Sequence, residues 1–209
     1  FDITFDAFSQ GKEDAKVIIE IKNDKKELKK EESDIRISVP QEKIDKFRQI
    51  LLYILKKIGG SPNVGMTVLY KILYFIDFDY YEKNEEQLMG LVYLKNHYGP
   101  TPRLFEKLID DLIEKGFVEV IKSEFYQYHQ RKYLINPAIE PDLSVINGKE
   151  KDHIDWELQR FSNLTAQQLT DLSHKDVPWI TADNGKPLDY EAVFYRTSET
   201  SVREYENTD

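Results

Sequence analysis

The sequence predicts an α+β protein with a mostly helical, winged-helix-like core, a β-hairpin and an N-terminal β arm. Three observations support this prediction. Apolar residues recur at helical spacing between residues 44 and 112, two β-rich runs follow Gly116, and two β-branched runs precede Pro40. With 209 residues and 40% hydrophobic composition, the chain can bury a core, and its length fits one domain plus an appendage or two small domains.

The first 39 residues differ in pattern from the rest of the chain. Residues 16–21 and 35–39 are predicted strands, and the run between them carries charges of both signs. We therefore expect an N-terminal β arm or hairpin with a charged linker over 1–39, a main domain over 40–197 and a polar tail over 198–209. Because the chain begins with Phe1 rather than Met, we also expect further residues upstream in the natural protein.

Two helices are predicted after Pro40. The apolar positions of the first are Ile44, Phe47, Leu51, Ile54, Leu55 and Ile58, and those of the second are Leu69, Ile72, Leu73, Ile76 and Tyr80. The second helix should be amphipathic, with Lys71, Asp77 and Asp79 off its apolar stripe. For Lys71 we favour a surface ion pair, with a partner contact as the alternative, and for the two carboxylates we favour a solvated face.

A strand-like run from Gly90 to Lys95 precedes another helix start. Thr101 is a suitable N-cap and Pro102 suits the first helical position, so we expect the helix to begin there and to end at Gly116. The runs 117–122 and 125–135 predict a hairpin.

The last part of the chain predicts three helical segments. Ile154, Leu158 and Phe161 indicate one helix, and Thr165 with Gln168 forms a capping-box pattern for the next. A final helical piece is expected over 190–195.

Reactive chemistry is not predicted for this chain. It has no cysteine, and its four histidines show none of the usual metal-ligand spacings. The residue types of a catalytic triad occur close together at Ser173, His174 and Asp176. The sequence around the serine lacks the Gly-x-Ser-x-Gly motif of a sharp nucleophile turn, so we do not expect a triad. We expect His174 to bind the last carbonyls of its helix, and we predict no cofactor and no metal site.

The negative charge of the chain is concentrated in its C-terminal third, which favours basic partners. Of the net charge of −9, residues 140–209 contribute most, with 7 basic and 15 acidic groups by count. Such a surface serves solubility or attracts a basic partner. If the fold is a winged helix, the helix that contacts DNA would be residues 66–83 or 103–115. Both are slightly acidic, so direct nucleic-acid binding is not expected. No run of about 18 apolar residues predicts a membrane span, and we expect a cytoplasmic protein.

Three short motifs occur in an order that resembles a known family. They are Lys71-Ile72-Leu73-Tyr74-Phe75, Tyr98-Gly99-Pro100, and Leu172-Ser173-His174 followed by Trp179. This order over residues 43–195 resembles the Panacea domain, also called the SocA-like antitoxin domain, which is related to phage-associated GepA proteins.

The resemblance implies an antitoxin, not an enzyme. Such a protein neutralises a cognate toxin by binding it directly, and the motif residues then have structural or partner-binding roles. They are Lys71, Tyr74, Phe75, Tyr98, Gly99, Pro100, His174 and Trp179. A homodimer is a further expectation. The alternative function is a winged-helix transcriptional regulator that binds DNA as a dimer.

Overall fold

The computed structural model describes residues 42–125 and 128–203. Contacts divide the chain between Ser38 and Val39, and every described residue belongs to the second of the two units. The predicted arm over 1–39 therefore lies outside the described residues, and the predicted domain boundaries stay predictions.

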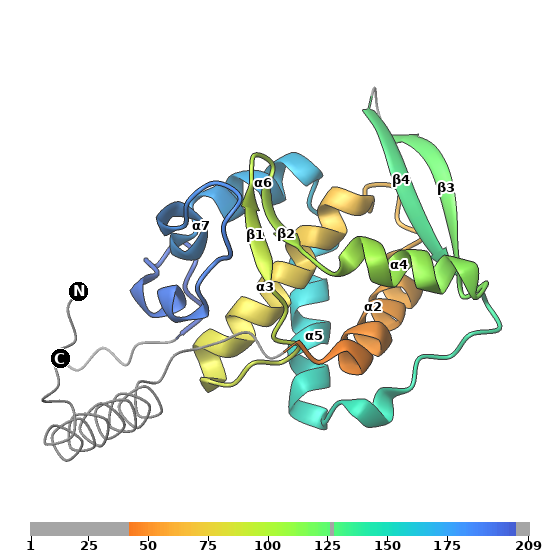
Figure 1. The fold of residues 1–209 in the computed structure, drawn as a ribbon, viewed down its shortest axis with the longest axis horizontal. Coiled ribbons are helices and arrows are strands. Elements are labelled where there is room, and N and C mark those ends of the chain that lie inside the picture. The colour runs from red at the N-terminus through yellow and green to blue at the C-terminus, as the bar shows by residue number, and fades with distance from the viewer. Residues whose placement is uncertain (1–41, 126–127, 204–209) are drawn as a thin grey trace, which may run out of the picture. The chain divides into compact units, whose positions relative to one another are not determined.

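Helices and two antiparallel hairpins make up the described unit, so the predicted α+β class is confirmed (Figure 1). In chain order the elements are α2 (Ile44–Ile58), α3 (Met66–Asn84), β1 (Tyr93–Asn96), β2 (Gly99–Pro102), α4 (Phe105–Glu114), β3 (Val118–Phe125), β4 (Tyr128–Ile135), η1 (Leu143–Val145), α5 (Gly148–Phe161), α6 (Ala166–His174), α7 (Val177–Thr181) and η2 (Tyr190–Tyr195). The winged-helix relationship stays a prediction.

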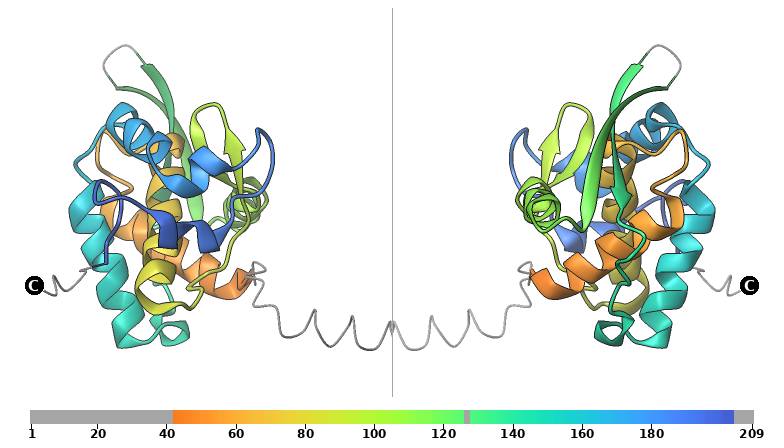
Figure 2. Two further views of the ribbon diagram at one scale, coloured as in Figure 1. Left: turned by 90° about the vertical axis from the view of Figure 1, so that its left-hand side faces the viewer. Right: turned by 90° about the vertical axis from the view of Figure 1, so that its right-hand side faces the viewer.

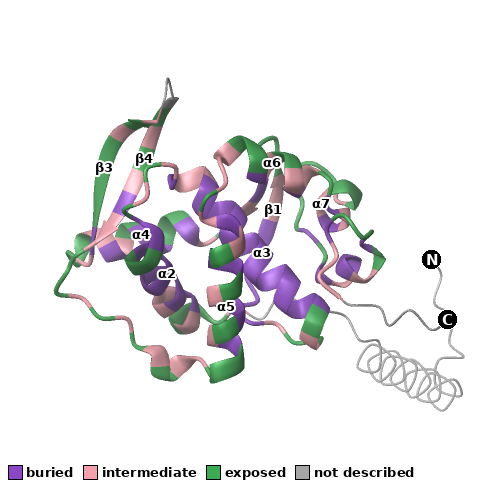
Figure 3. Ribbon diagram, turned by 180° about the vertical axis from the view of Figure 1, so that it is seen from behind, coloured by how far each residue is buried: buried purple, intermediate pink, exposed green. Residues whose placement is uncertain are grey.

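Helix α3 is the centre of the unit, and it is buried on all sides rather than amphipathic. Every residue from Val68 to Glu82 is buried, as the continuous purple of α3 in Figure 3 shows. Helices α5 and α6, the segment η2 and strand β2 all pack against it. The apolar stripe was identified correctly, but the expectation of a solvated face was wrong because later parts of the chain cover that face.

The Gly99–Pro102 segment is a strand, which corrects the predicted helix start. Strand β2 pairs with β1 in the register Tyr93↔Pro102 and Asn96↔Gly99, and α4 begins at Phe105 with Leu104 as its N-cap. Proline is tolerated here because β2 has one unpaired edge, where a missing N–H costs nothing. Residues 185–188 then hydrogen-bond to β1 on its other side, including Leu188 N–H to the Tyr93 carbonyl at 2.8 Å.

The second hairpin confirms the predicted pair of strands after Gly116. Strands β3 and β4 pair from Val118↔Ile135 to Phe125↔Tyr128. The inner end of the hairpin packs on the helices through Val118 and Tyr133, whereas its outer end extends away from them (Figure 2). The hairpin therefore forms a wall beside the helical core.

Helices α5 and α6 form where the sequence predicts them, whereas α7 replaces the proline turn that was expected before Trp179. The Thr165 side chain accepts the Gln168 N–H, and the Gln168 side chain accepts the Thr165 N–H, so the capping box of α6 is confirmed. Asn147 and Glu150 form a second capping box at the start of α5. The predicted helical piece over 190–195 is the 3₁₀ helix η2.

Candidate functional site

Residues far apart in the sequence meet beside the middle of α3. Gly99, in the tight β1–β2 hairpin, approaches Lys71 of α3 and Ser173 of α6 so closely that a Cβ at position 99 would lie 2.6 Å from Lys71 Cε and 2.7 Å from Ser173 Oγ. The φ of +98° at Gly99 is also a conformation that glycine adopts easily and other residues rarely do. All three predicted motifs thus meet at a point where no side chain fits.

Lys71 is buried, which corrects the expectation of a surface ion pair. Its exposed fraction is 1%, and its Nζ donates one long hydrogen bond of 3.4 Å to the Pro100 carbonyl. Burial lowers the pKa of the Lys71 amine to about 7, because a charged ammonium loses its hydration there. The head group of Lys71 does not reach the surface of the described unit, so the alternative of a partner contact stays a prediction.

His174 stacks on Trp179 instead of bonding the carbonyls at the end of α6. The two rings lie 4.0 Å apart at an interplanar angle of 14°, and Lys95 Nζ lies 4.4 Å from the centroid of the indole. Burial lowers the pKa of His174, and the nearby Lys71 lowers it further. The imidazole is therefore neutral near pH 7, which removes the charge that a helix C-terminus would attract.

A buried ionic network joins the C-terminal segment to α3 and to the start of α7. Arg196 donates to Asp79 and Glu82 at 2.7 Å each and makes a bidentate pair with Asp176. Tyr74 donates to Asp176 at 2.6 Å. All five side chains are buried, so Asp79 does not lie on the solvated face that the sequence suggested. Because several charged partners satisfy each other, the network fixes one arrangement of these elements.

Asp77 is buried as well, and it holds the start of the β1 segment. Its carboxylate accepts the backbone N–H groups of Met89, Gly90 and Leu91 and the hydroxyls of Tyr93 and Tyr190. Burial raises the pKa of Asp77, and these hydrogen bonds act in the opposite direction. The Asp77 carboxylate therefore has a structural role, in which it fixes the chain before β1, and it is not a solvated group.

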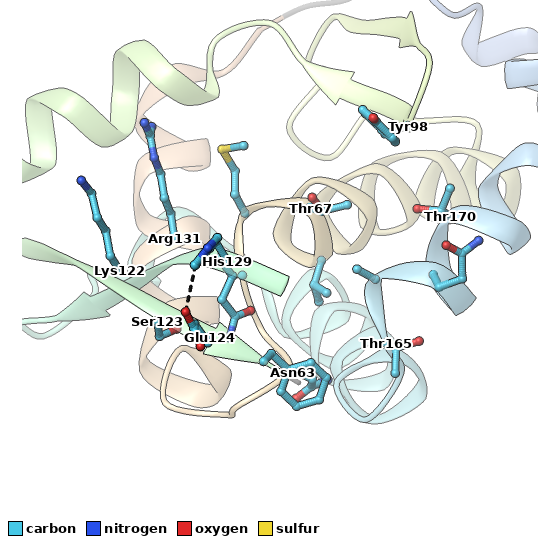
Figure 4. A pocket seen from close by; sticks show the side chains of 17 residues that line it. Asn63, Thr67, Tyr98, Lys122, Ser123, Glu124, His129, Arg131, Thr165 and Thr170 are labelled. Atoms are coloured by element: carbon cyan, nitrogen blue, oxygen red, sulfur yellow. Dashed lines mark ion pairs between the residues drawn. The ribbon is translucent and has the colours of Figure 1, made fainter. Parts of the chain in front are cut away.

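An open groove lies next to this cluster, between the β3–β4 hairpin and the N-termini of α3 and α6. It has a volume of about 1260 Å³ (Figure 4). Its described lining residues are Asn63, Gly65, Met66, Thr67, Val68, Tyr98, Lys122, Ser123, Glu124, Phe125, His129, Gln130, Arg131, Thr165, Ala166, Gln167 and Thr170. Tyr98 is 72% exposed and neighbours Gly99, so the groove adjoins the buried cluster directly.

The comparison with protein-family models identifies the chain. The model described as "Antitoxin SocA-like, Panacea domain" matches residues 69–180. The chain belongs to this family. Comparison with curated proteins and with solved structures gives no significant match. The predicted resemblance is thus confirmed, and the family description supports an antitoxin role.

The Panacea domain of this chain brings most of its motif residues into one region. Lys71, Gly99 and Pro100 lie at the close approach, and Tyr98 lies on the groove. His174, which follows Ser173 in the chain, stacks on Trp179. Phe75 is a core residue that contacts Phe161 at 4.7 Å between ring centroids. The partner-binding role predicted for these eight residues stays a prediction.

Two important residues were absent from the predicted set. Arg196 and Asp176 form the centre of the ionic network, yet neither belongs to a spacing pattern that marks a buried ion pair. Their sequence separation of 20 residues gives no local signal, because only the tertiary fold brings them together.

The serine of the triad-like residues Ser173, His174 and Asp176 is not accessible to solvent. Ser173 is fully buried and donates its hydroxyl to the Thr170 carbonyl at 2.9 Å. Within residues 42–125 and 128–203, no three histidine or acidic side chains gather closely enough to hold a metal ion. In the same ranges no helix has the length and apolar character needed to cross a bilayer. The accessible feature is the groove, which is suited to binding.

Proposed function

We propose that this Panacea-domain protein neutralises a cognate toxin by direct protein–protein binding, with the groove as its contact surface. The observation that carries the proposal is the position of Tyr98. This motif residue projects from the site where Gly99 packs on Lys71, and its side chain remains exposed on the groove. Tyrosine is a frequent anchor of protein interfaces because it offers a large, rigid surface with a polar end.

The buried cluster beneath Tyr98 supports the same role. Interface residues bind tightly when their position is fixed before binding, because less conformational entropy is then lost. The β1–β2 turn is fixed by the packing of Gly99 on α3 and by backbone hydrogen bonds to residues 185–188. Tyr98 is therefore presented by a rigid support.

The acidic C-terminal third contributes less to the surface than its composition suggests. Glu157 and Asp176 are fully buried and Glu150 nearly so, and they pair with Arg160, Arg196 and Lys46 respectively. Attraction of a basic toxin by the remaining exposed carboxylates is part of the proposal as a contribution to the association rate. A cytoplasmic location and a homodimer also remain proposals.

Coexpression with the product of the neighbouring gene tests this function. We expect the two proteins to copurify as a complex and the toxicity of the second to disappear. Replacement of Tyr98 by Ala should weaken the complex by at least about tenfold, as expected for an interface anchor. Tyr195→Ala is the matched control, because Tyr195 is similarly exposed at 78% but lies on η2, outside the groove. Coexpression without a complex and with unchanged toxicity would contradict the proposal.

The alternative of a DNA-binding regulator has less support. Helix α3 is buried along its length and cannot enter a DNA groove. The exposed positions of α4 and its C-cap hold Glu106, Asp110 and Glu114 beside Lys107 and Lys115, so they offer phosphates no clustered positive charge. Salt-dependent binding to DNA of its own promoter region would support the alternative, and no binding at low salt would reject it.

A further inference from the structure

The β3–β4 hairpin places two cations opposite each other on one wall of the groove. Lys122 and Arg131 are direct cross-strand partners, and both line the groove (Figure 4). Neither side chain forms an ion pair with a carboxylate of the described residues; the nearest pair on the hairpin joins His129 and Glu124. Like charges directly opposite each other destabilise a strand pair, so this arrangement is unfavourable until an anion approaches it.

A second positive feature faces these cations across the groove. Helix α3 begins after Gly65, with no side-chain cap and no acidic residue in its first turn. Its first backbone N–H groups and the helix dipole therefore add a partial positive charge beside Met66 and Thr67, which line the groove. The N-terminus of α6 differs, since its capping box satisfies the equivalent groups.

Negative charge in the groove is nearly absent. Among its described lining residues Glu124 is the single carboxylate, and its Oε1 lies 3.2 Å from His129 Nδ1. Met66 on α3 and Tyr98 on the β1–β2 turn supply apolar surface to the groove. The groove thus combines an apolar floor with unpaired positive charge, although the whole chain has a net charge of −9.

We propose that the groove binds an acidic peptide segment of the partner toxin. This inference rests on the proposed function and names the chemistry of the contact. Carboxylates of the segment meet Lys122 and Arg131 and relieve their mutual repulsion, and its apolar side chains pack on Met66 and Tyr98. Electrostatic complementarity of this kind favours an acidic segment over a basic one at the groove itself, whatever the net charge of the whole toxin.

A polypeptide fits the groove better than a nucleic acid does. Nucleic-acid binding normally uses several phosphate contacts along a continuous basic surface. The groove offers two cations, and helix α4, which packs beside β3, presents Glu106, Asp110 and Glu114 to solvent. A chain of several phosphates would exceed the positive charge that the groove offers, whereas a short segment with a few carboxylates would match it.

A peptide titration tests the chemistry of the groove without the toxin. The probe is a soluble peptide of about ten residues, the upper end of ordinary strand length, in which Glu alternates with Leu and Tyr. Its effect on the backbone amide signals of the full chain is followed by NMR at low salt. We expect shifts at Thr67, Tyr98 and Lys122 that disappear at high salt. A peptide with Lys in place of Glu, and a single-stranded oligonucleotide of similar length, should leave these signals unchanged.

Charge reversal provides the matched variants. The double variant Lys122→Glu with Arg131→Glu should bind the acidic peptide at least tenfold more weakly. The control double variant Lys107→Glu with Lys149→Glu changes the net charge by the same amount outside the groove, and it should bind the peptide as the native protein does. The single variant Lys122→Glu creates an opposite-charge cross-strand pair, so it should lose affinity while its melting temperature stays equal or rises. That combination separates lost binding from misfolding. Absence of shifts with the acidic peptide, equal binding by the groove double variant, or preferential binding of the oligonucleotide overturns the inference.

The same variants in the coexpression experiment separate this inference from the proposed function. If a complex forms and the groove double variant weakens it at least tenfold, the proposed function and the acidic-segment inference are both supported. A complex that forms equally well with this variant leaves the function standing and overturns the acidic-segment inference for the toxin. If no complex forms, the proposed function fails, and the peptide titration still decides which ligand chemistry the groove accepts.

Discussion

Lys71 shows how one buried side chain can make stability depend on pH. Its amine has an ordinary pKa of 10.5 in an unfolded chain and a pKa of about 7 in the folded protein. Between these values the unfolded state holds a proton that the folded state does not, so stability rises with pH across this window. Below pH 7 the folded protein carries the full cost of a buried charge.

Replacement of Lys71 by Met should therefore stabilise the protein most below pH 7 and progressively less as the pH rises towards 10.5. The expected gain at the acidic end is on the order of a few kcal/mol, since one pKa unit corresponds to about 1.4 kcal/mol. Denaturant unfolding of both proteins at several pH values measures it. The pKa of His174, measured by NMR, should also be higher in the Lys71→Met variant, because Lys71 lowers it in the native protein. A constant stability difference across the pH range would contradict the assigned pKa of Lys71.

The residue scale also shows which sequence-based interpretations were wrong. Lys71, Asp77 and Asp79 were expected at the surface, because charged residues are rarely buried without partners. Each of them has partners, but these come from β2, the β1 segment or the C-terminal segment. Helical periodicity describes one element at a time and contains no information about what covers its polar face.

At the scale of elements, the C-terminal segment completes the burial of α3. Arg196 connects η2 to the carboxylates of Asp79 and Glu82. Ser201 and Val202 then donate to the carboxylate of Glu82, so the first residues of the predicted polar tail lie against the helix. The tail boundary itself stays a prediction.

The exchange of Arg196 for Met should destabilise the fold by about 3–5 kcal/mol, because it leaves buried carboxylates without their cation. Arg203→Met is the matched control. Arg203 pairs with Glu85 at a partly exposed position, where the loss should be about 1 kcal/mol or less. Chemical denaturation compares the two variants. Equal effects would show that the buried network adds nothing beyond an ordinary surface pair.

At the scale of the whole molecule, the described unit should fold without the first 39 residues. Its described core and ion pairs lie within residues 42–203, and contacts divide the chain between Ser38 and Val39. A fragment over 40–209 should keep the melting temperature of the full chain within a few degrees, as expected when little stability is lost.

A shorter fragment over 40–195 should fail to fold, because it lacks Arg196 and the residues that bind Glu82. Circular dichroism and calorimetry distinguish the two fragments. A cooperative transition in the shorter one, or none in the longer one, would show that the domain limits are drawn in the wrong place.

The sequence by itself determined the fold class, most helix positions, the second hairpin and the family. These follow from local signals: apolar periodicity for α2 and α3, the capping box of Thr165, and motif residues that occur in a fixed order. Such signals depend on neighbours within a few positions of each other in the chain.

Only the tertiary structure decided which polar groups are buried and where the accessible surface lies. Arg196 meets Asp79 across 117 residues, and the groove is built from α3, α6 and two hairpins. Contacts at such separations form through the packing of complete elements. The charge on Lys122 and Arg131 was visible in the sequence, but their position opposite each other beside Tyr98 was set by strand register and helix packing.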